Sequence, residues 1–199
     1  EELGVELRGG YYDQSGVVRD MVQNHILSVL SLIAMEPPSS ITGDSVRNEK
    51  VKVLESIRPM NPEEIIANTV RGQYGEGLVD GKTLPAYRSE PDVDPKSNTE
   101  TFVAMKLMVE NWRWSEVPFY IRSGKRLAAH TTQIVIGFRK APLLLFGEDM
   151  KDKLDPNRLV IHVQPDEGIT LDIHAKKPGP NLNVASVPLD FSYAEFGEH

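Results

Sequence analysis

Helical patterns fill the first third of the chain. Apolar residues recur at helical spacing over 15–35, which predicts one long, mostly buried helix that ends before Pro37-Pro38. A second helix is predicted from 44 or 45 to the break at Pro59. A third begins at the sequence Asn-Pro-Glu-Glu over 61–64, where a capping residue is followed by a proline and two acids.

From residue 69 onward the apolar period changes to two, which predicts strands. The five residues 164–168 have the length of a hairpin link, so much of the sheet should be antiparallel. Helices followed by strands predict an α+β domain, with a large, mostly antiparallel sheet and helices packed on one face. The segment 74–98 has no periodicity and is predicted to be a functional loop or an excursion across the sheet. The clearest alternation covers 103–109, 134–138, 159–163 and 169–173.

Composition narrows the function classes. The 199 residues fit a single compact domain spanning 1–199. No run approaches the ~20 apolar residues of a membrane helix, so we expect no membrane partner. The absence of cysteine fits a cytoplasmic location. An excess of 29 acidic over 22 basic residues argues against nucleic acid. The chain begins at Glu1 without a methionine or a leader, which predicts an internal boundary.

Several cofactor motifs are missing from the sequence. There is no Gly-x-Gly-x-x-Gly fingerprint, no Gly-x-x-x-x-Gly-Lys-Ser/Thr loop and no His-Glu-x-x-His pair. We therefore predict no residues in this chain that bind a coenzyme, and no metal site.

His25 is the first candidate for chemistry. A helical projection places it in the middle of the apolar stripe, so we expect its imidazole to be half-buried. One interpretation is a hydrogen-bonded core histidine. The other is a general base, because burial disfavours the charged imidazole and keeps it neutral near pH 7.

A long motif supports the second interpretation. The pattern Glu-x-x-Gly-x-Glu-x-Arg-Gly-x-Tyr-Tyr-Asp over 1–13, followed by Gly-x-x-Arg-Asp-Met-x-Gln-Asn-His over 16–25, closely resembles that of the glucose-6-phosphate dehydrogenases. The similarity extends over essentially the whole chain. It includes Arg-Gly-Gln-Tyr over 71–74, Arg-Ser-Gly-Lys-Arg-Leu over 122–127 and Lys-Lys-Pro-Gly over 176–179.

The resemblance implies a reaction. In that family the histidine of Gln-Asn-His takes the proton from the anomeric hydroxyl of glucose 6-phosphate, while C1 gives a hydride to NADP. His25 matches this base. The family's Asp-His-Tyr-x-x-x-Lys segment and its glycine-rich Rossmann coenzyme domain, normally N-terminal, are absent from this chain. The resemblance therefore implies the C-terminal, substrate-binding domain, inactive when isolated, and the residues that would decide between NADP and NAD lie outside it.

Three residues match the family's substrate ligands: Glu1, Asp20 and Lys125. Without the resemblance, Asp20 reads as a solvated helix acid and Lys125 as a solvated charge in a hairpin turn. On an ideal helix Asp20 lies ~140° from His25, so either the two approach one substrate from different sides or the helix is irregular there. His130 stands where the family usually has a second basic residue, which puts that cation in doubt.

The resemblance also implies a homodimer through the sheet, and Met108, Val135 and Val160 add apolar side chains on its second face. Animal members bind a structural NADP on this domain with basic residues. His162 and Asp172 stand there instead, so we expect no such site. Two other functions remain open: a dimerisation or scaffold module without catalysis, and a hydrolase that uses a carboxylate pair from 74–98.

Overall fold

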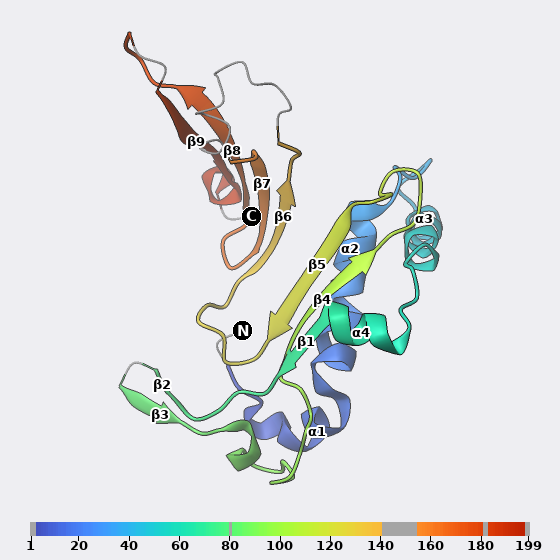
Figure 1. Cartoon of the computed structure of the whole chain (residues 1–199), viewed down its shortest axis with the longest axis vertical. Helices are drawn as coiled ribbons and strands as arrows, with labels where there is room; N and C mark the ends of the chain where they lie inside the picture. The colour runs from blue at the N-terminus through green and yellow to red at the C-terminus, as the bar shows by residue number, and fades with distance from the viewer. Residues whose placement is uncertain (1–2, 80, 141–154, 181–182, 198–199) are drawn as a thin grey trace. The chain divides into compact units, whose positions relative to one another are not determined.

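A computed structural model of the chain describes residues 3–79, 81–140, 155–180 and 183–197. The chain divides into two compact units, Glu1–Ala128 and Ala129–His199, called unit 1 and unit 2 below. Figure 1 shows that unit 1 holds the α-helices together with a three-stranded sheet, whereas unit 2 is a four-stranded sheet.

The first predicted helix is present over 17–34, but it is not uniformly α-helical. The 3₁₀ turn η1 (Glu6–Arg8) leads into α1 (Gly9–Val17), which continues as the π-helix η2 (Val18–Ile26) and then as α2 (Leu27–Ala34). Gly16 has φ 66° and ψ 173°, which is not helical. Glycine adopts this backbone at no steric cost, so the chain changes direction there. The change of pitch that follows was not visible in the apolar pattern.

The other two helices agree with the prediction. Helix α3 (Gly43–Glu55) begins after Thr42, whose side chain accepts a hydrogen bond from the Ser45 amide. Helix α4 (Pro62–Asn68) begins with a capping box, in which Asn61 and Glu64 each satisfy the other's amide.

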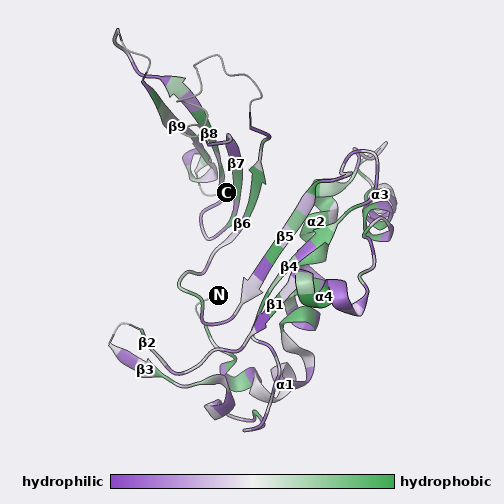
Figure 2. Ribbon diagram, in the orientation of Figure 1, coloured by the Kyte–Doolittle hydropathy of each residue, from purple (hydrophilic) through white to green (hydrophobic). Residues whose placement is uncertain are grey.

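The sheet of unit 1 carries the core. Strands β1 (Thr69–Gly72), β4 (Phe102–Met108) and β5 (Pro118–Gly124) pair antiparallel in the order β1-β4-β5. Alternate residues of β4 and β5 face α2, which Figure 2 shows as mostly hydrophobic. This cluster of buried residues consists of Leu30, Ala34, Val53, Leu107, Val109 and Ile121.

The segment 74–98 belongs to unit 1 and is held against its core. It contains the hairpin of β2 (Gly77–Val79) and β3 (Lys82–Leu84), followed by the 3₁₀ turn η3 (Tyr87–Ser89). Tyr87 is fully buried in a second core cluster with Tyr12 and Val17. The loop is therefore anchored on α1 by an aromatic core residue.

Unit 2 is an antiparallel sheet of β6 (Thr132–Gly137), β7 (Arg158–Gln164), β8 (Gly168–Lys176) and β9 (Val184–Ser192), closed by the turn η4 (Tyr193–Phe196). The predicted hairpin joins β7 to β8. The register puts apolar side chains on one face, called the apolar face below. These side chains are Ile134, Ile136, Leu159, Ile161, Ile169, Leu171, Ile173, Val187, Leu189 and Phe191.

The opposite face of unit 2 is largely polar. Val135 and Val160 pair there, beside an ion pair between Arg158 and Asp172. The described part of unit 2 contributes no α-helix to either face. Val135 and Val160 were expected to make the second face of the sheet apolar. Most apolar side chains of unit 2 lie instead on the other face, the apolar face defined above.

The α+β class is confirmed. All strand pairs among the described residues are antiparallel, and they fall into three sheets where the periodicity predicted one large sheet. Periodicity identifies strands but not their neighbours, because pairing depends on contacts between distant segments.

Candidate functional site

The π-helix η2 brings two of the predicted site residues onto one side. In a π-helix each backbone N–H bonds to the carbonyl five residues earlier, and the Leu27 N–H accordingly donates to the Val22 carbonyl. Asp20 and His25 are five residues apart, so they lie about one turn from each other. In an α-helix the same step would separate them by ~140°. Of the two alternatives given above, the helix is therefore irregular at Asp20 and His25. Such π-helical turns occur frequently at functional sites.

The expected burial of His25 is wrong. Its side chain is exposed, because the wider π-helical turn rotates this position away from the apolar stripe that an α-helical projection assigned to it. An exposed imidazole is accessible to a ligand.

Asp20 is not a solvated helix acid. Only 11% of its side chain is exposed, and the Arg8 guanidinium lies 3.4 Å from its Oδ1. Arg8 itself is 62% exposed and stacks at 5.3 Å over the Tyr11 ring. Arg8, the arginine of the Glu-x-Arg motif, therefore pairs with Asp20, the aspartate of the Arg-Asp motif.

Lys125 is a placed cation. It follows β5 directly, its amide donates to the Thr101 carbonyl at 2.9 Å, and only 7% of the residue is exposed. Its Nζ lies 5.8 Å from the centre of the Tyr12 ring in α1. Strand β5 also contacts η2. The hairpin interpretation with a solvated charge is therefore wrong, and the lysine lies against α1, which precedes the turn at Gly16 and the η2 helix of Asp20 and His25.

The resemblance singled out four further positions: Glu1, His130, His162 and Asp172. Glu1 lies outside the described residues. His130 is exposed and belongs to unit 2. On the polar face of unit 2, His162 contacts Thr170 at 3.0 Å, and Asp172 bonds Arg158 at 2.8 Å. These two side chains thus have cross-strand partners.

Two groups of neighbours were missed by the sequence reasoning. Glu90 is buried and contacts Arg126, the residue after Lys125. Asp13 accepts hydrogen bonds from Tyr87 and Ser97. The sequence motifs contain some of these residues, but the contacts join residues between 36 and 84 positions apart. No local pattern predicts such contacts.

The described acids of 74–98 do not form a buried carboxylate pair of the kind a hydrolase would use. Glu90 is committed to Arg126 and to the Tyr74 hydroxyl. The other described acids of the loop, Glu76, Asp92 and Asp94, are exposed. Asp94 contributes its amide to Asp13 and its side chain to the Lys96 amide.

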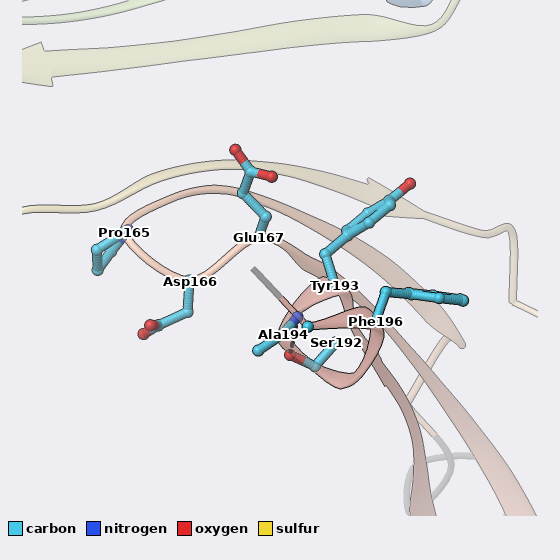
Figure 3. Close-up of a pocket in the computed structure, with 8 residues that line it drawn as sticks. Pro165, Asp166, Glu167, Ser192, Tyr193, Ala194 and Phe196 are labelled. Carbon is cyan, nitrogen blue, oxygen red and sulfur yellow. Dashed lines mark hydrogen bonds between the residues drawn. The ribbon is translucent and has the colours of Figure 1, made fainter. Parts of the chain in front are cut away.

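A hollow in the described structure lies away from these residues. Figure 3 shows it at the β7–β8 hairpin of unit 2, with Asp166 and Glu167 on one side and Tyr193 and Phe196 on the other. Its volume is about 790 Å³, but it is open to solvent. Its two carboxylates would repel a phosphorylated ligand. It contains none of the predicted site residues.

The described residues also bear on two other kinds of site, a metal centre and a membrane span. In this part of the chain, no group of three or more His, Asp or Glu side chains is arranged to hold a metal ion. Nor does any described helix combine the length and the apolar character needed to cross a membrane.

Comparison with known proteins agrees with the motif. The family model of the glucose-6-phosphate dehydrogenase C-terminal domain matches residues 1–199. Glucose-6-phosphate 1-dehydrogenase of Bacillus subtilis is 50% identical over 192 residues, which cover 96% of this chain and 39% of that protein. The enzyme of Treponema pallidum is 47% identical over 98% of this chain and 38% of its own length.

Solved structures give the same result. A structure of glucose-6-phosphate dehydrogenase in complex with its substrate glucose-6-phosphate matches 98% of this chain and 38% of its own, with 39% identity and a TM-score of 0.86. The Mycobacterium avium enzyme matches with a TM-score of 0.82 at 36% identity. The chain spans about two fifths of the length of these relatives. By its sequence and by its fold, the chain belongs to the family of glucose-6-phosphate dehydrogenase C-terminal domains.

Proposed function

We propose that this chain is the substrate-binding and base-carrying part of a protein that oxidises glucose 6-phosphate at C1 to 6-phosphogluconolactone. The relatives that it matches over about two fifths of their length carry that enzyme's name. The observation that carries the proposal is the π-helix, which gives Asp20 and His25 a common side. The same observation supports a polyhydroxylated ligand, since a carboxylate accepts hydroxyl protons and an imidazole removes one.

His25 is the proposed general base. A ring nitrogen of its imidazole takes the proton of the anomeric hydroxyl as the O–H bond breaks, and the C1–O bond becomes a carbonyl as C1 releases a hydride. The exposed side chain supports this role, because a base must reach the proton that it removes.

The proposed sugar ligands are Asp20, Lys125 and Glu1. Asp20 would accept a sugar hydroxyl proton, with Arg8 restraining its carboxylate. Lys125 would supply a positive charge to an anionic substrate from its position beside α1. Because only 7% of Lys125 is exposed, the direction of its side chain would decide whether its ammonium meets the substrate.

NADP is the coenzyme that the family implies, and it would take up the hydride when bound. The residues described here do not fit its usual cradle. Dinucleotide folds use parallel strands with a glycine-rich turn, whereas all strand pairs among these residues are antiparallel. We therefore assign no step of coenzyme binding to this chain and expect other parts of the full-length protein to bind it, in the cytoplasm.

The test is an activity assay on two proteins. The full-length protein should form NADPH from glucose 6-phosphate and NADP, and the isolated chain should form none. Hydride transfer requires both reactants in near-attack geometry, which can supply ~7–11 kcal/mol of the barrier reduction. NADPH formation by the isolated chain, or its absence in the full-length protein, would contradict the proposal.

A homodimer is the second part of the proposal. No α-helix among the described residues of unit 2 covers the apolar face of that unit. Leu189, which lies on this face, is 51% exposed. Exposed apolar faces of this kind mark protein interfaces. A non-catalytic dimerisation module would share this surface, but it would not need Asp20 and His25 on one side of a helix.

A further inference from the structure

The turn after β5 contains a strained residue. Arg126 has φ +54°, in the left-handed region that side chains other than glycine rarely adopt. Such strain persists only where surrounding contacts hold the backbone in place, and it tends to occur where a side chain must be positioned. Arg126 directly follows Lys125, so the contacts that hold its backbone also set the direction of the lysine.

A buried ion pair holds the Arg126 side chain. Its Nη2 lies 3.3 Å from Oε1 of Glu90, and the two side chains are only 17% and 5% exposed. The Tyr74 hydroxyl donates to the same Glu90 oxygen at 3.0 Å. Burial raises the pKa of Tyr74 to about 12, with the Glu90 contact adding to the rise, so this hydroxyl keeps its proton and remains a donor.

The same residues hold a third segment. The Arg126 amide donates to the Leu3 carbonyl at 3.1 Å, and the Val5 amide donates to the Tyr74 hydroxyl at 3.2 Å. Gly4 leaves room for the guanidinium, since a Cβ there would lie 2.7 Å from its Nε. The guanidinium also lies 5.8 Å from the centre of the Tyr74 ring. The turn of Lys125, the loop of Glu90 and the segment before η1 thus meet at one arginine.

We propose that Arg126 is a positioning residue, which through its buried ion pair with Glu90 holds Lys125 in the orientation that binds the anionic substrate. This inference rests on the proposed function of Lys125. Glu90 holds the Arg126 Nη2 and the Tyr74 ring lies against the guanidinium, whose buried Nε has no hydrogen-bond partner among the described residues. The guanidinium thus faces protein groups, and its effect on the substrate passes through the lysine. Loss of the ion pair therefore weakens substrate binding rather than the chemical step.

The first experiment is steady-state kinetics on the full-length protein. Arg126→Met should raise KM for glucose 6-phosphate about tenfold, the factor that corresponds to ~1.4 kcal/mol, with kcat and KM for NADP within about twofold. Arg126→Lys keeps the charge and should recover most of the affinity. Glu90→Gln should raise KM as well, and the double variant should be no worse than the worse single variant, because both changes remove one contact.

The matched control is Arg113→Met. Arg113 also pairs with a glutamate, Glu36, but both side chains are half-exposed and lie on other segments of unit 1. This variant should leave KM unchanged. A purely structural role for Arg126 would lower the melting temperature and leave KM of the folded fraction unchanged, which would overturn the proposal.

A second readout separates this inference from the proposed function. Lys125→Ala should raise KM by itself. If Lys125→Ala raises KM and Arg126→Met does not, the positioning role alone fails. If the wild-type protein has no activity, the proposed function fails, and hydrogen exchange still decides the structural claim. Arg126→Met should then speed exchange of the Val5 and residue-126 amides but not those of α3. Unchanged exchange would overturn it.

Discussion

Asp13 offers the sharpest test of how the site helix is held. Its Oδ1 accepts from the Tyr87 hydroxyl at 2.8 Å and also from Ser97, and its Oδ2 accepts from the Asp94 amide at 3.3 Å. Its carbonyl accepts from the Thr99 hydroxyl at 2.7 Å. These contacts tie the end of the 74–98 loop to α1, three residues before the turn at Gly16. Asp13→Ala removes the three side-chain bonds at once.

The magnitude follows from the burial of the donors. Tyr87 is fully buried and Ser97 is 8% exposed, so their hydroxyls would lose a charged acceptor with little water to replace it. A buried group left without its partner costs about 1–3 kcal/mol, and such losses are not additive within one network. We expect Asp13→Ala to lower the free energy of unfolding by about 2–4 kcal/mol.

Urea unfolding of the purified protein, followed by far-ultraviolet circular dichroism, measures the change. Asp13→Asn keeps the shape and one acceptor oxygen, so it should be less destabilising than Asp13→Ala. Asp44→Ala is the control at an exposed carboxylate, which pairs with Arg47 on the helix surface, and it should change little. An Asp13→Ala variant within about 0.5 kcal/mol of wild type would refute the reasoning.

Stability should depend on pH through the same carboxyl. Burial raises the pKa of Asp13, but the four hydrogen-bond donors around it outweigh burial and hold the pKa below its usual value. A depressed folded-state pKa contributes stability above the unfolded value of about 3.9, which is lost as the pH falls through the folded value. The stability difference between wild type and Asp13→Asn should therefore shrink below about pH 4. A difference independent of pH from 7 to 2 would contradict this account.

Three further predictions test the site and the assembly. In the full-length protein, His25→Asn should lower kcat by ~10²–10⁴ with little change in KM or melting temperature, because His25 is exposed; unchanged turnover with a lowered melting temperature would defeat the catalytic role. Gly16→Ala should cost about 1–2 kcal/mol in urea unfolding, because φ is +66° and the new Cβ would lie 2.8 Å from the Glu100 carboxylate; a neutral effect would mean that this turn is not strained. Leu189→Glu, on the apolar face of unit 2, should convert a dimer to a monomer in sedimentation at tens of micromolar, whereas a wild-type monomer or an unaffected dimer would count against that interface.

The local elements were predictable because their signals are local. The capping box of α4 and the hairpin between β7 and β8 need only neighbouring residues, and both are observed. The same holds for the alternation in β4, whose Val103 and Leu107 are buried as the period of two required. Family motifs likewise marked Asp20, His25 and Lys125 as site candidates.

The tertiary structure decided how those candidates are presented. The α-helical projection buried His25 and separated it from Asp20, whereas the π-helix exposes His25 and places both on one side. The chain leaves the α1 direction at Gly16, where the Val17 amide bonds to the Glu100 carbonyl. That partner lies more than eighty residues further along the chain.

The burial of Lys125 has a similar origin. Its surroundings come from Thr101, Tyr12 and the ion pair of its neighbour Arg126 with Glu90, which belong to separate segments of unit 1. Residue type and spacing determined which side chains can act as base, acid or cation. Their exposure and direction depend on long-range hydrogen bonds and on one buried ion pair, because these interactions offset backbone strain that no local preference would accept.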